Sequence, residues 1–422
     1  MRPVDLRHRR RLVVLSGSSA LQAAAGAVAA LVATQSLGPK ERGLMVLGLT
    51  IGSLYGLVGG LGCGPAFRSR LPAARLPSTR RHLVSSFTWC SLAGGCLAVV
   101  AAVLTTAVSA AWIDPDLRSG PFLVATASYT VAQVMLGVVP DGWFADGHFR
   151  RGGVAAAGMS AGGLVGVGVA LFGTHSAATV LNAQAVGIVM VGVIEMSAMR
   201  RAGLLSLGRP DLARSAILLR RGLPALGLAV GLAVVLRADR YVLGTTVGTT
   251  AVGVYSLAAT LAEVSRILPA ALGQLFLRDV SVGRPPMARF APAVRFAIAS
   301  AVVSGVIVVT GGWLLIVPVF GPQFAPARPL LTLLAVAEVG FAPYAVASRG
   351  LLGGGWTRAA GALGVCGGLG GVAVYVVAAR IGGAMGTAVG SGLVYASLSI
   401  VSCALLRRRV SGTSRNRGSV DR

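Results

Sequence analysis

Residues 200–243 read RRAGLLSLGRPDLARSAILLRRGLPALGLAVGLAVVLRADRYVL, a basic segment followed by a long apolar run. All six arginines before the run fall in Arg200–Gly222, the longest hydrophilic stretch of the chain. A helix needs about 20 mostly apolar residues to cross the hydrocarbon core of a bilayer, and Leu223–Leu243 meets that length. This stretch therefore predicts a membrane helix preceded by a basic loop.

The same alternation of apolar runs and short polar segments extends in both directions. Only 12% of the 422 residues are charged, about half the share in a soluble domain. We expect an all-α polytopic membrane protein with about twelve transmembrane helices. The predicted spans are Leu12–Leu37, Gly43–Pro65, Leu83–Val108, Phe122–Val139, Val154–Phe172, Ala177–Ala198, Leu223–Leu243, Ala251–Leu275, Phe296–Val319, Leu330–Ala347, Ala359–Ala378 and Ala384–Leu406.

Basic residues gather on alternate loops. They crowd the N-terminus, the segment Arg68–Arg81, the central segment and the tail after Leu406, whereas loops such as Asp114–Gly120 hold few. By the positive-inside rule the basic loops are cytoplasmic, so both termini are predicted in the cytoplasm and the protein in the cytoplasmic membrane. Topology thus accounts for the net charge of +25, and no nucleic-acid partner is expected.

The central basic segment divides the spans six and six. We predict an N-terminal lobe (1–199), a basic cytoplasmic linker (200–222), a C-terminal lobe (223–406) and a basic cytoplasmic tail (407–422). Because six is even, the lobes would be parallel repeats that enclose a central cavity. A faint repeat at an offset of 210 agrees, with the identities Gly38/Gly248, Gly43/Gly253, Leu47/Leu257 and Thr50/Thr260.

Ionisable residues inside predicted spans are candidates for function, because their burial in lipid is costly. Arg237 and Arg240 are three residues apart and share a helix face. Two guanidinium groups facing a cavity could bind a pyrophosphate or an acidic sugar. Alternatively, both extend to the outer interface and Asp239 neutralises them locally. Gln22 lies in another span and could line the same polar cavity or join two helices by hydrogen bonds.

Two further spans carry carboxylates. Glu263 and Arg266 can pair with each other on one helix, either to hold helices together or to contact substrate. Glu338 has no opposite charge near it in sequence. Such a carboxylate in a low dielectric can take up and release a proton, which suits coupling to a proton or sodium gradient. It could also be a permanently protonated packing residue.

The sequence lacks the usual motifs for metal binding and for nucleotide binding. The cysteines and histidines show no metal-ligand spacing, and no GxxxxGK[ST] phosphate loop occurs. We therefore expect neither a metal nor an organic cofactor. An alternative function is that of an enzyme, a membrane-embedded polysaccharide polymerase or glycosyltransferase. Such enzymes usually carry a sizeable outer loop, and the short outer loops of this chain argue against this alternative.

Four segments in order along the chain resemble the polysaccharide flippase branch (O-antigen or exopolysaccharide type) of the multidrug/oligosaccharidyl-lipid/polysaccharide exporter superfamily. They are LGPKERGL (37–44), DRYVLG (239–244) with VGVY (252–255), FGPQF (320–324) with PLL (329–331), and IGGAMGTA (381–388). The resemblance implies a two-lobed helical transporter that moves a polyprenyl-pyrophosphate-linked oligosaccharide between leaflets by alternating access.

The resemblance also implies partners. These would be the lipid-linked oligosaccharide, membrane lipids, and polysaccharide polymerases and glycosyltransferases of the same assembly. Arg237, Arg240, Asp239 and Gln22 are then the expected substrate-binding residues, with Glu338, Glu263 and Arg266 coupled to the ion gradient. A drug or small-cation exporter of the same superfamily remains the alternative, and it should place acids rather than arginines in its cavity.

Overall fold

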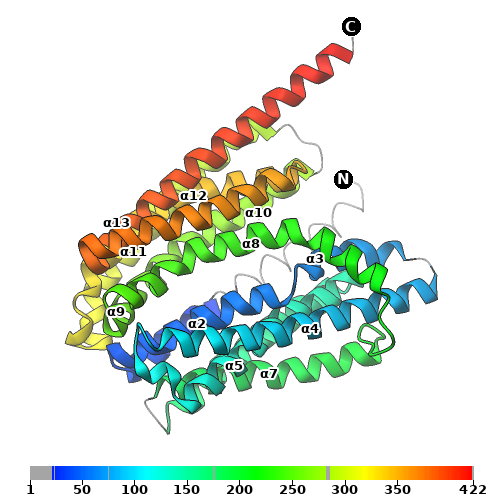
Figure 1. The fold of residues 1–422 in the computed structure, drawn as a ribbon. Coiled ribbons are helices and arrows are strands. Elements are labelled where there is room, and N and C mark those ends of the chain that lie inside the picture. The colour runs from blue at the N-terminus through cyan, green and yellow to red at the C-terminus, as the bar shows by residue number, and fades with distance from the viewer. Residues whose placement is uncertain (1–20, 23, 75, 174–175, 282–285, 421–422) are drawn as a thin grey trace. The chain divides into compact units, whose positions relative to one another are not determined.

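The computed structural model describes residues 21–420, except residues 23, 75, 174–175 and 282–285. Its secondary structure is entirely helical within these ranges (Figure 1). The described residues contain ten helical segments that are long and apolar enough to cross a membrane. The prediction of an all-α polytopic membrane protein is confirmed.

The difference between ten segments and twelve predicted spans has two sources. Ala24–Ser36 is a shorter apolar helix inside the first predicted span, which begins outside the described residues. The last two predicted spans both fall in α13 (Thr357–Val420), which is interrupted by non-helical backbone at Gly382 and Gly383. Gly383 has a φ of 54°, a conformation that glycine adopts without a steric cost. The predicted boundary between these spans therefore coincides with a kink.

The chain divides into two compact units. Unit 1 comprises Met1–Val230 with Gly248–Gly253, and unit 2 comprises Gly231–Val247 with Val254–Arg422. Besides Ala24–Ser36, unit 1 contains the helices α2 (Pro39–Gly59), α3 (Cys63–Arg70), η1 (Leu71–Ala73), α4 (Pro77–Ser109), η2 (Pro115–Arg118), α5 (Gly120–Ala145), α6 (Phe149–Ala170), α7 (Ala177–Arg201) and the first part of α8 (Leu212–Thr246).

Small residues let the helices of unit 1 pack closely. Helix α5 contacts α2, α4, α6 and α7, so it lies at the centre of this packing. Between α6 and α7, a Cβ on Gly162 would lie 2.5 Å from the carbonyl oxygen of Gly187, and the reverse distance would be 2.0 Å. Only glycine permits this approach of two backbones, as is common between membrane helices.

The central basic segment is attached to α4 rather than free. Ser85 Oγ and Trp89 Nε1 both donate to the carbonyl oxygen of Gly208, the latter at 2.9 Å. Ser86 Oγ donates to Asp211 O at 3.1 Å and accepts from Asp211 N at 3.2 Å. Helix α8 begins at Leu212, within the segment 200–222 that the sequence predicts as a linker.

Unit 2 contains the rest of α8, most of α9 (Thr249–Ala262), η3 (Glu263–Arg266), α10 (Ile267–Ser281), α11 (Pro286–Phe320), η4 (Pro322–Phe324), α12 (Ala327–Gly353) and α13. Helix α12 contacts α10, α11 and α13, and α10, α12 and α13 run side by side in Figure 1. Of the candidate spans, α12 has the largest buried share, 67%, against 17% for α11. A charge on α12 is therefore enclosed by protein rather than by lipid.

The exposed faces of the long helices are strongly apolar. On α11, Val303, Val306 and Leu314 are each at least 60% exposed. On α4, Leu97 is 68% exposed and Leu104 is 59% exposed. Such large apolar areas would be unfavourable in water, but they are the expected surface of helices that contact acyl chains.

Candidate functional site

The helix breaks where the charged residues of unit 2 gather. Helices α9 and α10 are separated by the 3₁₀ turn η3, which includes Glu263 and Arg266. Pro269 lacks the N–H that would bond to the carbonyl of Ser265, so a regular α-helix cannot continue unchanged through this point. In a 3₁₀ turn, residues three apart lie on one side, which directs both charged side chains the same way.

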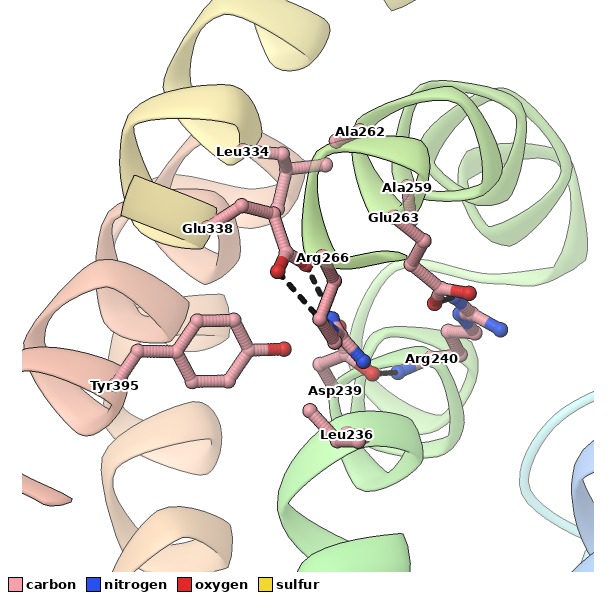
Figure 2. Close-up of a pocket in the computed structure, with 10 residues that line it drawn as sticks. All are labelled: Leu236, Asp239, Arg240, Ala259, Ala262, Glu263, Arg266, Leu334, Glu338 and Tyr395. Carbon is pink, nitrogen blue, oxygen red and sulfur yellow. Dashed lines mark hydrogen bonds and ion pairs between the residues drawn. The ribbon is translucent and has the colours of Figure 1, made fainter. Parts of the chain in front are cut away.

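These side chains line a small cavity within unit 2 (Figure 2). Its volume is about 10 Å³, enough for roughly one water molecule. The polar residues around it come from α8, η3, α12 and α13, and Leu236, Ala259, Ala262 and Leu334 complete the wall. The polar residues are Asp239, Arg240, Glu263, Arg266, Glu338 and Tyr395.

Arg240 and Glu263 form an ion pair between α8 and η3. Arg240 Nη2 donates to Glu263 Oε1, and the side chains are 8% and 38% exposed. Arg240 Nε is also buried, and it has no hydrogen-bond partner among the described residues. Within the same part of the chain, no hydrogen bond to Glu263 Oε2 is formed. This pair therefore keeps one unused donor and one unused acceptor.

Arg266 and Glu338 form a more complete pair. Arg266 Nε donates to Glu338 Oε2 at 2.8 Å, and Nη2 donates to Oε1, so both carboxylate oxygens are bound. The guanidinium carbon also lies 4.9 Å from the ring centre of Phe341 and 5.9 Å from that of Tyr395. Figure 2 shows the Tyr395 hydroxyl directed toward Arg266. A bidentate pair with two aromatic contacts fixes Arg266 strongly.

Glu338 has no opposite charge near it in sequence, but its counter-ion is Arg266, which lies 72 residues away along the chain. The expected pairing of Glu263 with Arg266 on one helix is also replaced by two pairings between helices. If Glu263 and Arg266 paired only with each other, Arg240 and Glu338 would be buried without counter-ions. An uncompensated buried charge costs several kcal/mol, so the crossed arrangement is favoured.

Asp239 is bound by hydrogen bonds rather than by a direct salt bridge. Its Oδ2 accepts from the Tyr255 hydroxyl at 2.8 Å, and its Oδ1 accepts from the backbone N–H of Arg240 at 2.8 Å. The Tyr255 hydroxyl also lies 3.2 Å from Ser391 Oγ, which joins α8 and α9 to α13. Asp239, Tyr255 and Ser391 are all buried, so this network belongs to the interior of unit 2.

The structure thus brings five of the seven predicted residues together, namely Asp239, Arg240, Glu263, Arg266 and Glu338. Arg237 is half-buried and its charge acts on Glu263, but it does not line the cavity. Gln22 is half-buried in unit 1, so its place in a shared site stays a prediction.

Sequence reasoning missed the tyrosines. Tyr255 lies in the segment VGVY that carries part of the family resemblance, and this was the available signal for its hydrogen bond to Asp239. Tyr395 lies in an apolar stretch without any marker. No local pattern connects it with Arg266, because their proximity depends on how α13 packs against α12.

The fold is that of exporters of the MOP superfamily. A multidrug resistance MATE family transporter of that superfamily, in an inward-facing conformation, has a TM-score of 0.75 at 15% identity, with 92% of this chain and 94% of that chain covered. The lipid II flippase MurJ, in an inward closed conformation, has a TM-score of 0.72 at 11% identity, with 93% and 91% covered.

The chain belongs to the polysaccharide biosynthesis protein family, whose profile matches residues 9–276. The matched range includes Arg240, Glu263 and Arg266 and ends before Glu338. Among curated proteins, none matches the chain. The chain is therefore a polysaccharide biosynthesis protein whose fold is similar to that of a MATE family transporter of the MOP superfamily and of the flippase MurJ.

Proposed function

We propose that this protein moves a polyprenyl-pyrophosphate-linked oligosaccharide across the cytoplasmic membrane by alternating access. The observation that carries the proposal is Arg240, which is 7% exposed and retains a buried N–H donor without a partner among the described residues. In a polysaccharide biosynthesis protein, the anion available to such a donor is the pyrophosphate of the lipid carrier or an acidic sugar. Membership of that family favours a glycolipid over other anions.

Arginine suits this task for a geometric reason. Its planar guanidinium presents several donors in a fixed arrangement that matches phosphate oxygens, and it stays charged at every physiological pH. Arg237 lies one helical turn before Arg240 and adds a second positive charge. Asp239 fixes the backbone between them through the N–H of Arg240. In this proposal Arg237 and Arg240 attract the anionic group and Asp239 positions Arg240, and Gln22 is a further predicted substrate residue.

The carboxylates would couple transport to an ion gradient. Glu263 and Glu338, with Arg266 between them, form an alternating series of charges that a proton or sodium ion could alter. Both termini would be cytoplasmic, because the basic loops are expected on that side. Polysaccharide polymerases and glycosyltransferases of the same assembly would supply and consume the glycolipid.

The test is leaflet exchange of a polyprenyl-pyrophosphate oligosaccharide in proteoliposomes that contain the purified full chain, with and without a proton or sodium gradient. Exchange above that of empty liposomes, reduced at least about tenfold by Arg240→Gln in correctly inserted protein, would support the proposal. Arg328→Gln is a matched control, since this arginine also has a buried Nε without a partner among the described residues, but it contacts Trp313 and does not line the cavity.

Unchanged exchange in the Arg240→Gln and Arg237→Gln variants would refute the substrate role of these arginines. Efflux of a cationic dye without any glycolipid exchange would instead identify a drug exporter. That alternative has one supporting feature, the presence of three carboxylates in the cavity wall, Asp239, Glu263 and Glu338.

A further inference from the structure

The two ion pairs of the cavity differ in how completely their carboxylates are bound. Glu338 is 4% exposed, and both of its oxygens accept from Arg266. Glu263 is 38% exposed, and within the described part of the chain only Oε1 accepts, from Arg240. A carboxylate held through one oxygen and open on one side separates more readily than a bidentate, enclosed one. Glu263 is therefore the acid that can leave its arginine.

We propose that Glu263 and the anionic group of the substrate compete for Arg240, and that Glu263 takes up a proton when the anion displaces it. The inference rests on the proposed function, in which Arg240 binds that anion. It assigns the coupled proton to Glu263 rather than to Glu338.

The small space around Arg240 supports this competition. The cavity has a volume of about 10 Å³, room for roughly one water molecule. Arg240 Nη2 is already bound to Glu263, and only Nε is a buried donor without a partner among the described residues. A phosphate can approach both nitrogens only after the Glu263 carboxylate has moved. An anion bound through Nε and Nη2 would therefore compete with Glu263 for Nη2.

Charge balance explains why Glu263 would take up a proton when an anion binds Arg240. The groups whose charges act on or with Glu263 are Arg237, Asp239 and Arg240 on α8, Arg266 on η3, Glu338 on α12 and Tyr395 on α13. An anion that replaced an ionised Glu263 would add negative charge to a site that already holds two other carboxylates. Like charges in a low dielectric disfavour each other strongly. Protonation of Glu263 removes this cost.

The replacement of Glu263 by the phosphate at Arg240 conserves both atoms and charge. The Arg240–Glu263 ion pair, one negative charge of the incoming phosphate and one proton become an Arg240–phosphate ion pair and a neutral Glu263 acid. No covalent bond within the substrate changes. Release of the anion lets Glu263 return its proton and re-form the pair with Arg240. Substrate binding at this site therefore carries one proton with it.

The experiment is calorimetric titration of the purified full chain in detergent with farnesyl pyrophosphate as the probe. Titrations in two buffers of different ionisation enthalpy give the number of protons taken up. We expect the wild type to take up about one proton more than Glu263→Gln. We also expect Glu263→Gln to bind the probe at least about tenfold more tightly at pH 8, because the competitor has lost its charge. Since the same probe is used throughout, its own titration cancels in the comparison.

Two further variants test whether an effect of Glu263→Gln is caused by loss of folding rather than by loss of the titrating acid. Glu263→Asp keeps the charge on a shorter side chain, so proton uptake should persist with a tighter probe affinity than in the wild type. The double variant Arg266→Gln/Glu338→Gln removes both charges of the enclosed pair and leaves neither of them buried alone, so it should keep the uptake of about one proton if Glu263 is the responsible acid. Equal proton uptake by the wild type and Glu263→Gln would overturn the inference while leaving glycolipid exchange, measured separately, unaffected. Failure of the folded wild type to bind the probe would overturn both this inference and the substrate role of Arg240.

Discussion

Gly43 and Gly253 pack against each other in a reciprocal manner. A Cβ on Gly43 would lie 1.9 Å from the carbonyl oxygen of Thr249, and a Cβ on Gly253 would lie 1.9 Å from that of Pro39. Each contacted residue stands four positions before the other glycine. Arg42, which is buried, strengthens the same contact because its Nε donates to the Gly253 carbonyl at 3.1 Å.

Substitution of either glycine by alanine should therefore be poorly tolerated. The new methyl group would overlap a backbone carbonyl, which cannot rotate away as a side chain can. We expect Gly43→Ala and Gly253→Ala each to destabilise the protein by about 1–3 kcal/mol, as overpacking usually does. Thermal unfolding in detergent would measure this. Gly120→Ala is a suitable control, since nothing lies within 4 Å of its added Cβ. An unchanged midpoint for both variants would contradict the close contact.

This contact explains why a faint repeat was informative. The identities at an offset of 210 included Gly43 and Gly253, and these are the two residues that meet. The helical class, the positions of most spans and the break between the last two spans could also be predicted, because apolar length is a strong signal in lipid. The beginning of α8 at Leu212 could not, since its first turns are basic and partly polar.

The candidate site could be predicted residue by residue but not pair by pair. Ionisable residues in apolar spans are conspicuous, so Arg240, Glu263 and Glu338 were found from sequence alone. Their partners depend on helix packing over tens of residues. Spacing along one helix favoured pairing of Glu263 with Arg266, whereas burial of Glu338 on the enclosed helix α12 requires that Arg266 neutralise it instead.

Tyr255 should contribute to stability through Asp239. Tyr255→Phe removes the hydroxyl that donates to Asp239 Oδ2 at 2.8 Å and leaves a buried carboxylate with one donor fewer. We expect a loss of about 1–3 kcal/mol in unfolding free energy, because an unsatisfied buried acceptor retains its desolvation cost. Chemical unfolding followed by tryptophan fluorescence would measure the change.

Ser391→Ala is the matched control for Tyr255→Phe. It removes the second contact of the Tyr255 hydroxyl at 3.2 Å but leaves the donation to Asp239 intact. Its effect should be smaller than that of Tyr255→Phe. If Ser391→Ala proved the more damaging of the two, the hydrogen bond to Asp239 would not be the main role of this hydroxyl.

Asp211 should make the attachment of the central segment dependent on pH. Its carboxylate caps the start of α8 by accepting from the backbone N–H of Arg214 at 3.2 Å, and it pairs with the Arg214 side chain. These contacts, led by the backbone hydrogen bond, lower the pKa of Asp211. A carboxyl whose folded pKa is depressed stabilises the fold above its unfolded pKa and loses that contribution as pH falls through the folded value.

Hydrogen exchange of the first turn of α8 would reveal this loss. Amide protection around Arg214 should decline at acidic pH in the wild type, after correction for the intrinsic exchange rate. In Asp211→Asn the amide can still cap the helix, so protection should be nearly independent of pH in the same range. A pH dependence of equal size in both proteins would assign the titration to another group.

The Arg266–Glu338 pair should prove essential for stability, and removing both residues together should cost less than the sum of the two single removals. Arg266→Gln or Glu338→Gln leaves one buried charge without its partner, and each should cost about 3–5 kcal/mol. The double variant leaves neither charge, so its cost should fall below the sum of the single costs by at least about 1 kcal/mol. Unfolding measured for all four proteins forms a double-mutant cycle. Additive costs would mean that the two side chains act independently, in conflict with the bidentate contact between Arg266 and Glu338.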